Sequence, residues 1–292
     1  LHKDMIEFRA LHPFSHLKPA IHIFVLNVIG SVYLQLNNVL LGFMKDVEAV
    51  GYFTAATKIL VIAMSFSSSL GAVIMPRTSN LIAENKMDEF KTLIQKSYDF
   101  VLALAMPLTV GLIFISPSAI LLLSGEGFAS AILTSQIIAF NILTVSIAGV
   151  MGFQVLYPMG RINTVIFCTF IGAIVNILMN VLLTPVYGHN GTAVAYMLAE
   201  VAVTFSMFIL GRKYIPIQFF KKEHLHYIIG SVVMGIGLYF ISNSQLDNIM
   251  MLTFMLLVGG LTYVGILVVL KDSVSKIIQK TISQYFEKKK IL

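Results

Sequence analysis

The chain has 292 residues, of which 57% are hydrophobic and only 12% are charged, and its mean hydropathy is +0.87. A soluble domain carries about twice that share of charged residues, so this composition excludes a soluble globular protein. The formal net charge of +6 does not indicate binding to nucleic acid, because the basic residues are spaced along the chain as in a membrane protein. The single cysteine, Cys168, excludes a disulfide framework.

Eight long apolar stretches follow one another along the chain. They span residues 19–44, 50–75, 98–123, 130–156, 162–183, 191–210, 227–242 and 249–270. Each is near or above the roughly 20 residues that a helix needs to cross the hydrocarbon core, except 227–242, which is marginal. Strands of a membrane barrel alternate between apolar and polar residues, and these stretches do not. The sequence therefore predicts an all-α integral membrane protein with eight transmembrane helices.

The basic residues alternate between the two sides of the predicted membrane. All but two of the 20 lie in the N-terminal segment, in the second, fourth and sixth connections, or in the tail. The exceptions are Lys45, in the first connection, and Lys58, inside the second stretch. Cytoplasmic loops retain Lys and Arg because positive charge resists translocation. The pattern predicts that both ends of the chain lie in the cytoplasm.

The stretches and their connections divide the chain into five segments. These are a cytoplasmic N-terminal segment (1–18), a six-helix transmembrane lobe (19–210), a cytoplasmic loop (211–226), two peripheral transmembrane helices (227–270) and a basic amphipathic cytoplasmic tail (271–292). We expect the tail to lie on the anionic inner leaflet. Residues 77–97 place Ile82, Phe90 and Ile94 near one helical face, which predicts an interfacial connector. Because residue 1 is leucine, we expect the chain to begin inside a longer protein.

The second stretch carries a polar stripe. Thr54, Lys58, Ser65 and Ser69 follow one another at spacings of four, seven and four residues, which places them on one face of a helix. Lys58 is roughly 12 Å below the outer end at a rise of about 1.5 Å per residue. Its side chain snorkels over only part of that distance. We therefore expect Lys58 to face either a water-filled cavity or an acidic partner in a structural ion pair.

The sixth stretch contains an acidic residue at a matching depth. Tyr196, Glu200 and Thr204 share one face, and Glu200 is near the middle of the helix. A carboxylate at that depth pairs with a cation, exchanges a proton or meets water. Three interpretations therefore stay open for Glu200: an ion-coupling site for Na+ or H+, a salt bridge with Lys58, or simple exposure to water.

Other stretches repeat the polar pattern with neutral amides. A single buried amide is most often a hydrogen-bonding partner for a neighbouring helix, but several polar stripes together predict a shared cavity. Amides that converge with one cation suit a polyol, a sugar or a phosphate group. Arg77, after Pro76, lies either at the mouth of this cavity or in contact with lipid headgroups. The residues assigned to the cavity are Asn27, Gln35 and Asn38, with Asn37 turned away, Thr54, Lys58, Ser65, Ser69, Asn141, Asn176, Asn180 and Arg77.

Motifs of covalent chemistry are missing from the sequence. We find no phosphate-binding glycine-rich loop, no paired-histidine zinc motif and no nucleophile elbow. The predicted outward connections are short turns that leave no room for a catalytic domain. The sequence therefore predicts neither an enzyme nor a bound cofactor.

Five segments of the chain resemble a known family. They are VGYFTAATKI at 50–59, VIMPRTSNL at 73–81, PLTVGLIF at 107–114, LLLSGEGFASA at 121–131 and YGHNGTAVAYMLAE at 187–200. Together they resemble Wzx-like polysaccharide flippases of the multidrug/oligosaccharidyl-lipid/polysaccharide superfamily, over residues 14–210. Members have two six-helix lobes around a central cavity, often with two further helices. The resemblance implies that this chain is the second lobe plus that pair, with residues 1–18 as the inter-lobe linker.

The resemblance also implies a function. It implies translocation of an undecaprenyl-pyrophosphate-linked oligosaccharide, such as an O-antigen unit, across the bacterial cytoplasmic (inner) membrane by alternating access. The expected partners are that lipid and membrane lipids, and an association with polysaccharide assembly machinery fits the same role. Lys58 falls in a motif where members often carry a basic residue, which implies contact with the pyrophosphate or the glycan. Many members have an acidic residue where this chain has Asn37 and Asn38, which argues against a cation site there.

Two other functions stay open. A drug or cation antiporter of the same superfamily uses buried carboxylates in its cavity, and this chain offers Glu200 nearly alone. A membrane enzyme of glycan assembly, such as a polymerase or a ligase, would need a large outward loop that the predicted short turns do not provide.

Overall fold

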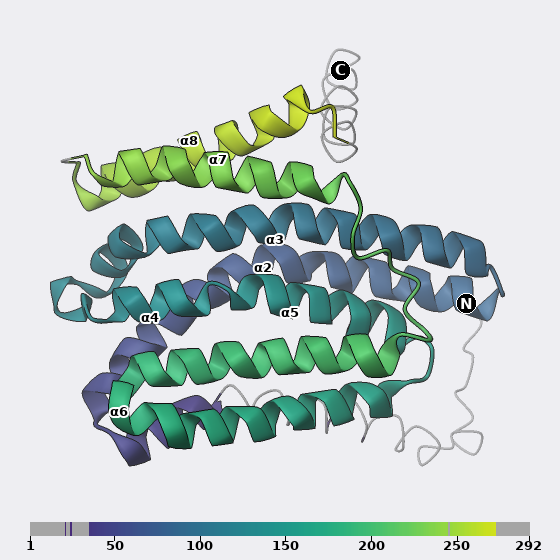
Figure 1. Ribbon diagram of the computed structural model, residues 1–292, viewed down its shortest axis with the longest axis horizontal. Coiled ribbons are helices and arrows are strands. Elements are labelled where there is room, and N and C mark those ends of the chain that lie inside the picture. Colours follow the sequence, from purple (N-terminus) through teal and green to yellow (C-terminus); the bar gives the residue numbers. More distant parts are fainter. Residues whose placement is uncertain (1–20, 22–23, 25–34, 245, 273–292) are drawn as a thin grey trace, which may run out of the picture.

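The computed structural model describes residues 21, 24, 35–244 and 246–272. Helices dominate this part of the chain, which contains no strand, so the predicted all-α fold is confirmed. Residues 35–44 are helical and lead into the labelled elements of Figure 1. These are α2 (Val47–Ala83), α3 (Met87–Ser124), the short helix η3 (Glu126–Phe128), α4 (Ala131–Ile138), α5 (Asn141–Gly149), the π-helix η4 (Val150–Leu156), α6 (Ile162–Gly211), α7 (His224–Ser242) and α8 (Asn248–Val269).

Six helical segments of the described chain are long and apolar enough to cross a membrane. One of them is α6, a helix of 50 residues with non-helical backbone angles at Gly188 (φ 57°, ψ −136°). Figure 1 shows that its two halves fold back against each other, so α6 corresponds to the fifth and sixth predicted spans. Most of the first predicted span, including Asn27, lies outside the described residues, as do residues 1–18 and the tail from 273 onward.

The predicted interfacial connector at 77–97 is wrong. Helix α2 continues to Ala83, and α3 begins at Met87 after a turn in which Asn85 has a φ of 56°. Phe90 and Ile94 are completely buried in the hydrophobic core. The apolar face that suggested a helix on the membrane surface instead packs against other helices. Contact with protein removes apolar side chains from water just as contact with lipid does, so the pattern fits either environment.

The fourth predicted span is broken into α4, α5 and η4. The π-helical turn η4 is seven residues long and contains Gly152, where an added Cβ would contact the side chains of Met207 and Val165. It also carries Gln154, whose buried Oε1 accepts a hydrogen bond of 2.6 Å from Ser97 Oγ on α3. Single π-turns of this kind re-aim side chains within a helix. Here the turn directs a polar group at a neighbouring helix.

The helices form a layered bundle. Helices α7 and α8 pack against each other and against α3 at one side of the bundle, and α6 lies at the opposite side (Figure 1). Helix α8 is also bonded to α3, because the Tyr263 hydroxyl donates a buried hydrogen bond of 2.6 Å to the carbonyl of Ala103. Residues 212–223, which we call the strap, link α6 to α7 and cross the bundle beside the start of α3.

Candidate functional site

The candidate site begins with the polar face of α2 and the helical residues 35–44. Thr54 Oγ1 donates to Asn38 Oδ1 over 3.4 Å, and Asn38 Nδ2 donates to Gln35 Oε1 over 3.5 Å. Lys58 is one helical turn beyond Thr54, and its side chain is exposed. The structure therefore brings Gln35, Asn38 and Thr54 together beside the only cation predicted inside a span.

The rest of the α2 stripe is less complete. Ser65 is exposed, and its hydroxyl donates to the carbonyl of Ile62 within the same helix. The side chain of Ser69 lies outside the described part of the structure. Arg77 is exposed and lies about 45 Å along α2 from the start of that helix at Val47, which is farther than the roughly 30 Å of the hydrocarbon core. That position fits the membrane surface better than the middle of the bilayer.

A second polar group is buried where the first helix meets both halves of α6. Asn37 Oδ1 accepts hydrogen bonds from Asn176 Nδ2 at 3.0 Å and from Asn180 Nδ2 at 3.1 Å. Thr184 Oγ1 donates to Asn180 Oδ1 at 2.8 Å and lies 3.0 Å from Thr192 Oγ1. All five side chains are buried. We call this set the amide network.

The amide network changes the predicted cavity. Asn176 and Asn180 were expected to converge with Asn38, but they meet Asn37, which is one residue and about 100° away around the helix. Both are fully buried, so they do not line an open surface with Lys58. The five side chains of the network satisfy one another and include no carboxylate, which makes them a neutral connection between helices.

Glu200 and Asn141 lie elsewhere in the interior. Glu200 is 8% exposed, and its carbonyl accepts from Thr204 Oγ1, which also donates to Thr144 on α5. The ion pairs among the described residues do not include one between Lys58 and Glu200. Asn141 is completely buried, and neither polar atom of its amide has a hydrogen-bond partner in the described structure.

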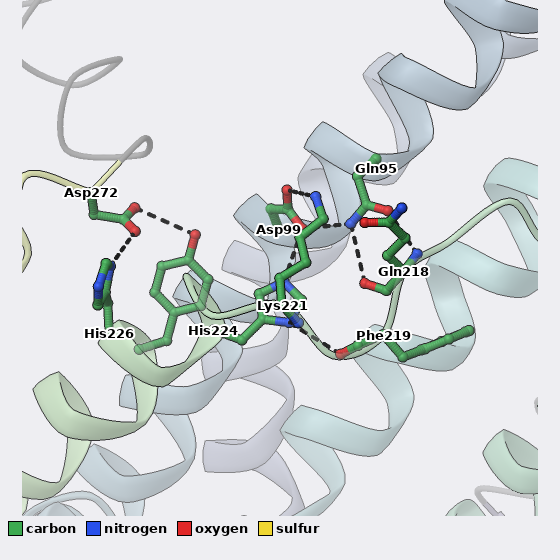
Figure 2. Close-up of polar contacts among 9 residues, drawn as sticks. Gln95, Asp99, Gln218, Phe219, Lys221, His224, His226 and Asp272 are labelled. Carbon is green, nitrogen blue, oxygen red and sulfur yellow. Dashed lines mark hydrogen bonds and ion pairs between the residues drawn. The ribbon is translucent and has the colours of Figure 1, made fainter.

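Sequence reasoning missed a third polar group, at the end of the bundle that carries the strap. Gln95 and Asp99 on α3 contact Gln218, Lys221 and His224 (Figure 2). The two residues of α3 are more than 100 positions away in the chain from the three residues that they contact. The available signal was the spacing of Gln95 and Asp99, which lie one helical turn apart where the third apolar stretch begins. It was overlooked because the surrounding segments were interpreted as a surface connector and a loop.

The exposed face of α2 carries a positive charge and several hydrogen-bonding groups. An ammonium group inside a membrane span is costly unless it faces water or a ligand. Lys58 supplies positive charge, while Thr54, Asn38 and Gln35 supply donors and acceptors. These are the types of side chain that can bind phosphate or hydroxyl groups without covalent chemistry. The described residues contain no group of three or more His, Cys, Asp or Glu side chains that could hold a metal ion.

The fold defines a multi-pass membrane protein with polar side chains on one face of α2 and between its helices. The family model described as lipid II flippase MurJ matches residues 7–259. The chain therefore belongs to the MurJ family of lipid flippases, within the superfamily that its motifs resemble. The narrower Wzx-like group is not distinguished by this match.

Curated relatives are similar over much of the chain. An uncharacterised membrane protein of Methanocaldococcus jannaschii, MJ1068, is 26% identical over 86% of this chain and 51% of its own length. The probable low-salt glycan biosynthesis flippase Agl15 of Haloferax volcanii is 24% identical over 58% of this chain and 36% of its own length. A Shigella dysenteriae protein named as an O-antigen transporter is 25% identical over 70% of this chain and 50% of its own length. The chain thus spans about half, or less, of these relatives.

A solved structure shares the fold. The lipid II flippase MurJ in its inward closed conformation superposes with a TM-score of 0.69, at 17% sequence identity. The superposition covers 86% of this chain and 54% of that protein. At this level of identity, the likeness supports the bundle architecture and carries no residue roles.

Proposed function

We propose that this chain is the second lobe of a flippase that moves an undecaprenyl-pyrophosphate-linked oligosaccharide across the bacterial cytoplasmic membrane by alternating access, without covalent chemistry. The observation that carries the proposal is Lys58, an exposed cation inside a membrane span, beside the linked polar side chains of Thr54 and Asn38. Membership of a lipid flippase family and the names of two relatives support a lipid-linked saccharide as the cargo.

The position of Lys58 explains why the cargo should be anionic at one end. An exposed ammonium in a span would be unfavourable against lipid tails, so this face of α2 must meet water or another protein surface. The first lobe of the full-length protein, placed opposite α2, would enclose this face in a cavity. The ammonium then binds a pyrophosphate as a point charge, and the neighbouring amides and hydroxyls bind sugar hydroxyl groups.

The test replaces Lys58 in the full-length protein. Lys58→Ala should abolish display of the glycan at the cell surface, whereas Lys58→Arg should retain part of it because the charge remains. Lys45→Ala is the matched control, since Lys45 is an exposed lysine in the turn before α2. Wild-type display by a normally expressed Lys58→Ala protein would refute the role of this face.

A second candidate function rests on Glu200. A buried carboxylate in a span is the feature that drug or cation antiporters of the superfamily use, and Glu200 is 8% exposed on α6. Efflux assays on intact cells separate the two functions. Drug resistance that depends on Glu200, with normal glycan display after its replacement, would favour the antiporter.

A further inference from the structure

Two residues of α3 hold the strap in a fixed place. Gln95 Oε1 accepts a hydrogen bond of 2.8 Å from the backbone N–H of Gln218, and Gln95 Nε2 donates to the Gln218 carbonyl over 3.4 Å. One side chain therefore contacts both backbone groups of the same strap residue, as a neighbouring strand would (Figure 2). This arrangement fixes the direction in which the strap crosses α3.

Asp99, one turn along α3 from Gln95, collects three contacts on one carboxylate. Its Oδ2 lies 3.0 Å from Lys221 Nζ, and its Oδ1 lies 3.0 Å from His224 Nε2 and accepts from Gln95 Nε2 at 2.7 Å. The side chains of Asp99 and His224 are only 19% and 7% exposed. Hydrogen bonds to a charged, largely buried acceptor are stronger than those between neutral groups at a surface.

A second histidine and carboxylate join the two ends of the α7–α8 hairpin. His226 Nδ1 lies 3.1 Å from Asp272 Oδ2, and the Tyr227 hydroxyl donates to Asp272 Oδ1 over 3.4 Å (Figure 2). The Asp272 side chain is completely buried and follows the end of α8. His224 and Tyr227 stack, with ring centroids 5.9 Å apart, so the two polar groups meet on the first turns of α7.

Apolar contacts reinforce the same attachment. Tyr98 on α3 meets the rings of Phe219 and His224 edge-on, at centroid distances of 5.4 and 5.6 Å. Farther along, α7 approaches α3 so closely at Gly235 that an added Cβ would lie 2.9 Å from a methyl group of Val110. The hairpin is thus attached to α3 at the strap end and along its length.

We propose that the contacts of Gln95 and Asp99 with the strap and His224, here called the clamp, make α3, the strap and the α7–α8 hairpin one rigid body. Without the clamp, apolar contacts alone would hold the strap and the first turn of α7 to α3, and the hairpin could rock on its remaining contacts near Gly235 and Tyr263. With the clamp, any displacement of α3 carries α7 and α8 with it. The hairpin therefore acts as an extension of α3, whatever cargo the protein moves.

Spin-label distances test this rigidity in the full-length protein. Labels at Lys96 on α3 and at Leu261 on α8 occupy exposed positions on the two parts. We expect one narrow distance distribution in the wild-type background and a distribution at least twice as wide in Asp99→Ala. Asp88→Ala is the control, because Asp88 is on the same helix and forms only an exposed pair with Lys91. A wild-type distribution that is already broad, or an unchanged width in Asp99→Ala, would overturn the proposal.

Hydrogen exchange gives a second, independent measurement. Loss of the clamp should raise amide exchange at least tenfold in the strap and in the first two turns of α7, with no change in α4 or the second half of α6. If Asp99→Ala does not fold, Gln95→Ala is the substitute, because it leaves Asp99 bonded to Lys221 and His224. That variant should speed exchange in the strap alone. A uniform rise along the chain in either folded variant would show that the clamp stabilises the whole bundle and does not attach the hairpin.

Discussion

At the scale of the residue, neutral amides and charged groups have separate places in this bundle. Asn37, Asn176 and Asn180 are buried and bonded to one another, whereas Lys58 is exposed on α2. The difference follows from desolvation: an amide needs only a matching partner to be buried, and an ammonium needs water or an anion. Polar residues that looked alike in the sequence therefore divide into a buried, mutually bonded group and an exposed group.

The amide network makes a prediction about stability. Asn180→Ala removes bonds to Asn37 and Thr184 and leaves a small cavity, so it should lower the free energy of unfolding by about 2 kcal/mol. Thr169→Ala is a suitable comparison, because Thr169 bonds only to Val165 of its own helix. Reversible unfolding in detergent would measure both variants. Equal stability of Asn180→Ala and wild type would contradict a structural role.

Glu200 makes a prediction about energy coupling. If it is the ion-coupling residue, Glu200→Gln should abolish the dependence of transport on a proton or sodium gradient and leave cargo binding intact, because the amide cannot carry the charge. Transport into proteoliposomes, with each gradient imposed in turn, measures this. Gradient-driven transport at the wild-type rate by Glu200→Gln would exclude the residue from coupling.

At the scale of the element, α6 shows how backbone and side chain jointly make a turn. The helix reverses at Gly188, where the positive φ is strained for any residue with a side chain. Gly191 follows, and there a Cβ would overlap the carbonyl of Leu183 on the other half of the helix. Glycine at both positions lets the two halves of α6 approach within backbone contact.

This close approach predicts a strong effect of one methyl group. Gly191→Ala should destabilise the protein by about 2 kcal/mol or more, because the atom it meets is backbone that cannot rotate away. Gly127→Ala, in the turn before α4 with open space around it, should change the stability by less than about 0.5 kcal/mol. Thermal unfolding of the two variants under the same conditions tests this difference in stability. Similar melting of both would show that the halves of α6 separate at little cost.

At the scale of the whole molecule, the bundle has two distinct ends. The turn between α2 and α3 and the strap share one end, and the turn around η3 and the bend of α6 share the other (Figure 1). The end with the strap carries basic residues, including Arg212, Lys213 and Lys222. The positive-inside rule assigns that end to the cytoplasm.

Orientation can be measured directly. A cysteine in place of Lys213 should react with a membrane-impermeant reagent only from the cytoplasmic side, and one in place of Glu126 only from the outside. Both side chains are exposed, so lack of access cannot mimic protection by the membrane. Labelling of both cysteines from the same side would overturn the predicted topology, including the shared compartment of the two chain ends.

Much of the fold was predictable from the sequence. The span of α8 and the turn at 124–129 follow from local hydropathy, which does not depend on distant residues. The start of α2 after Asp46 lies three residues before the predicted start of the second stretch at residue 50. The extended α2–α3 hairpin was not predicted, because the apolar face of Phe90 and Ile94 is equally suited to lipid and to protein. The broken fourth span was also missed, since a π-turn leaves little trace in a hydropathy pattern.

Part of the candidate site was likewise predictable from the sequence, and part was not. Sequence alone was enough to predict the class of membrane protein, the approximate spans and the stripe containing Thr54 and Lys58, because hydropathy and helical spacing depend on neighbours along the chain. The bond of Asn176 to Asn37 and the contact of Asp99 with His224, 125 residues away, became visible only in the folded bundle. Such partners depend on how each helix is rotated in the bundle, and that rotation is set by the packing of all the helices together.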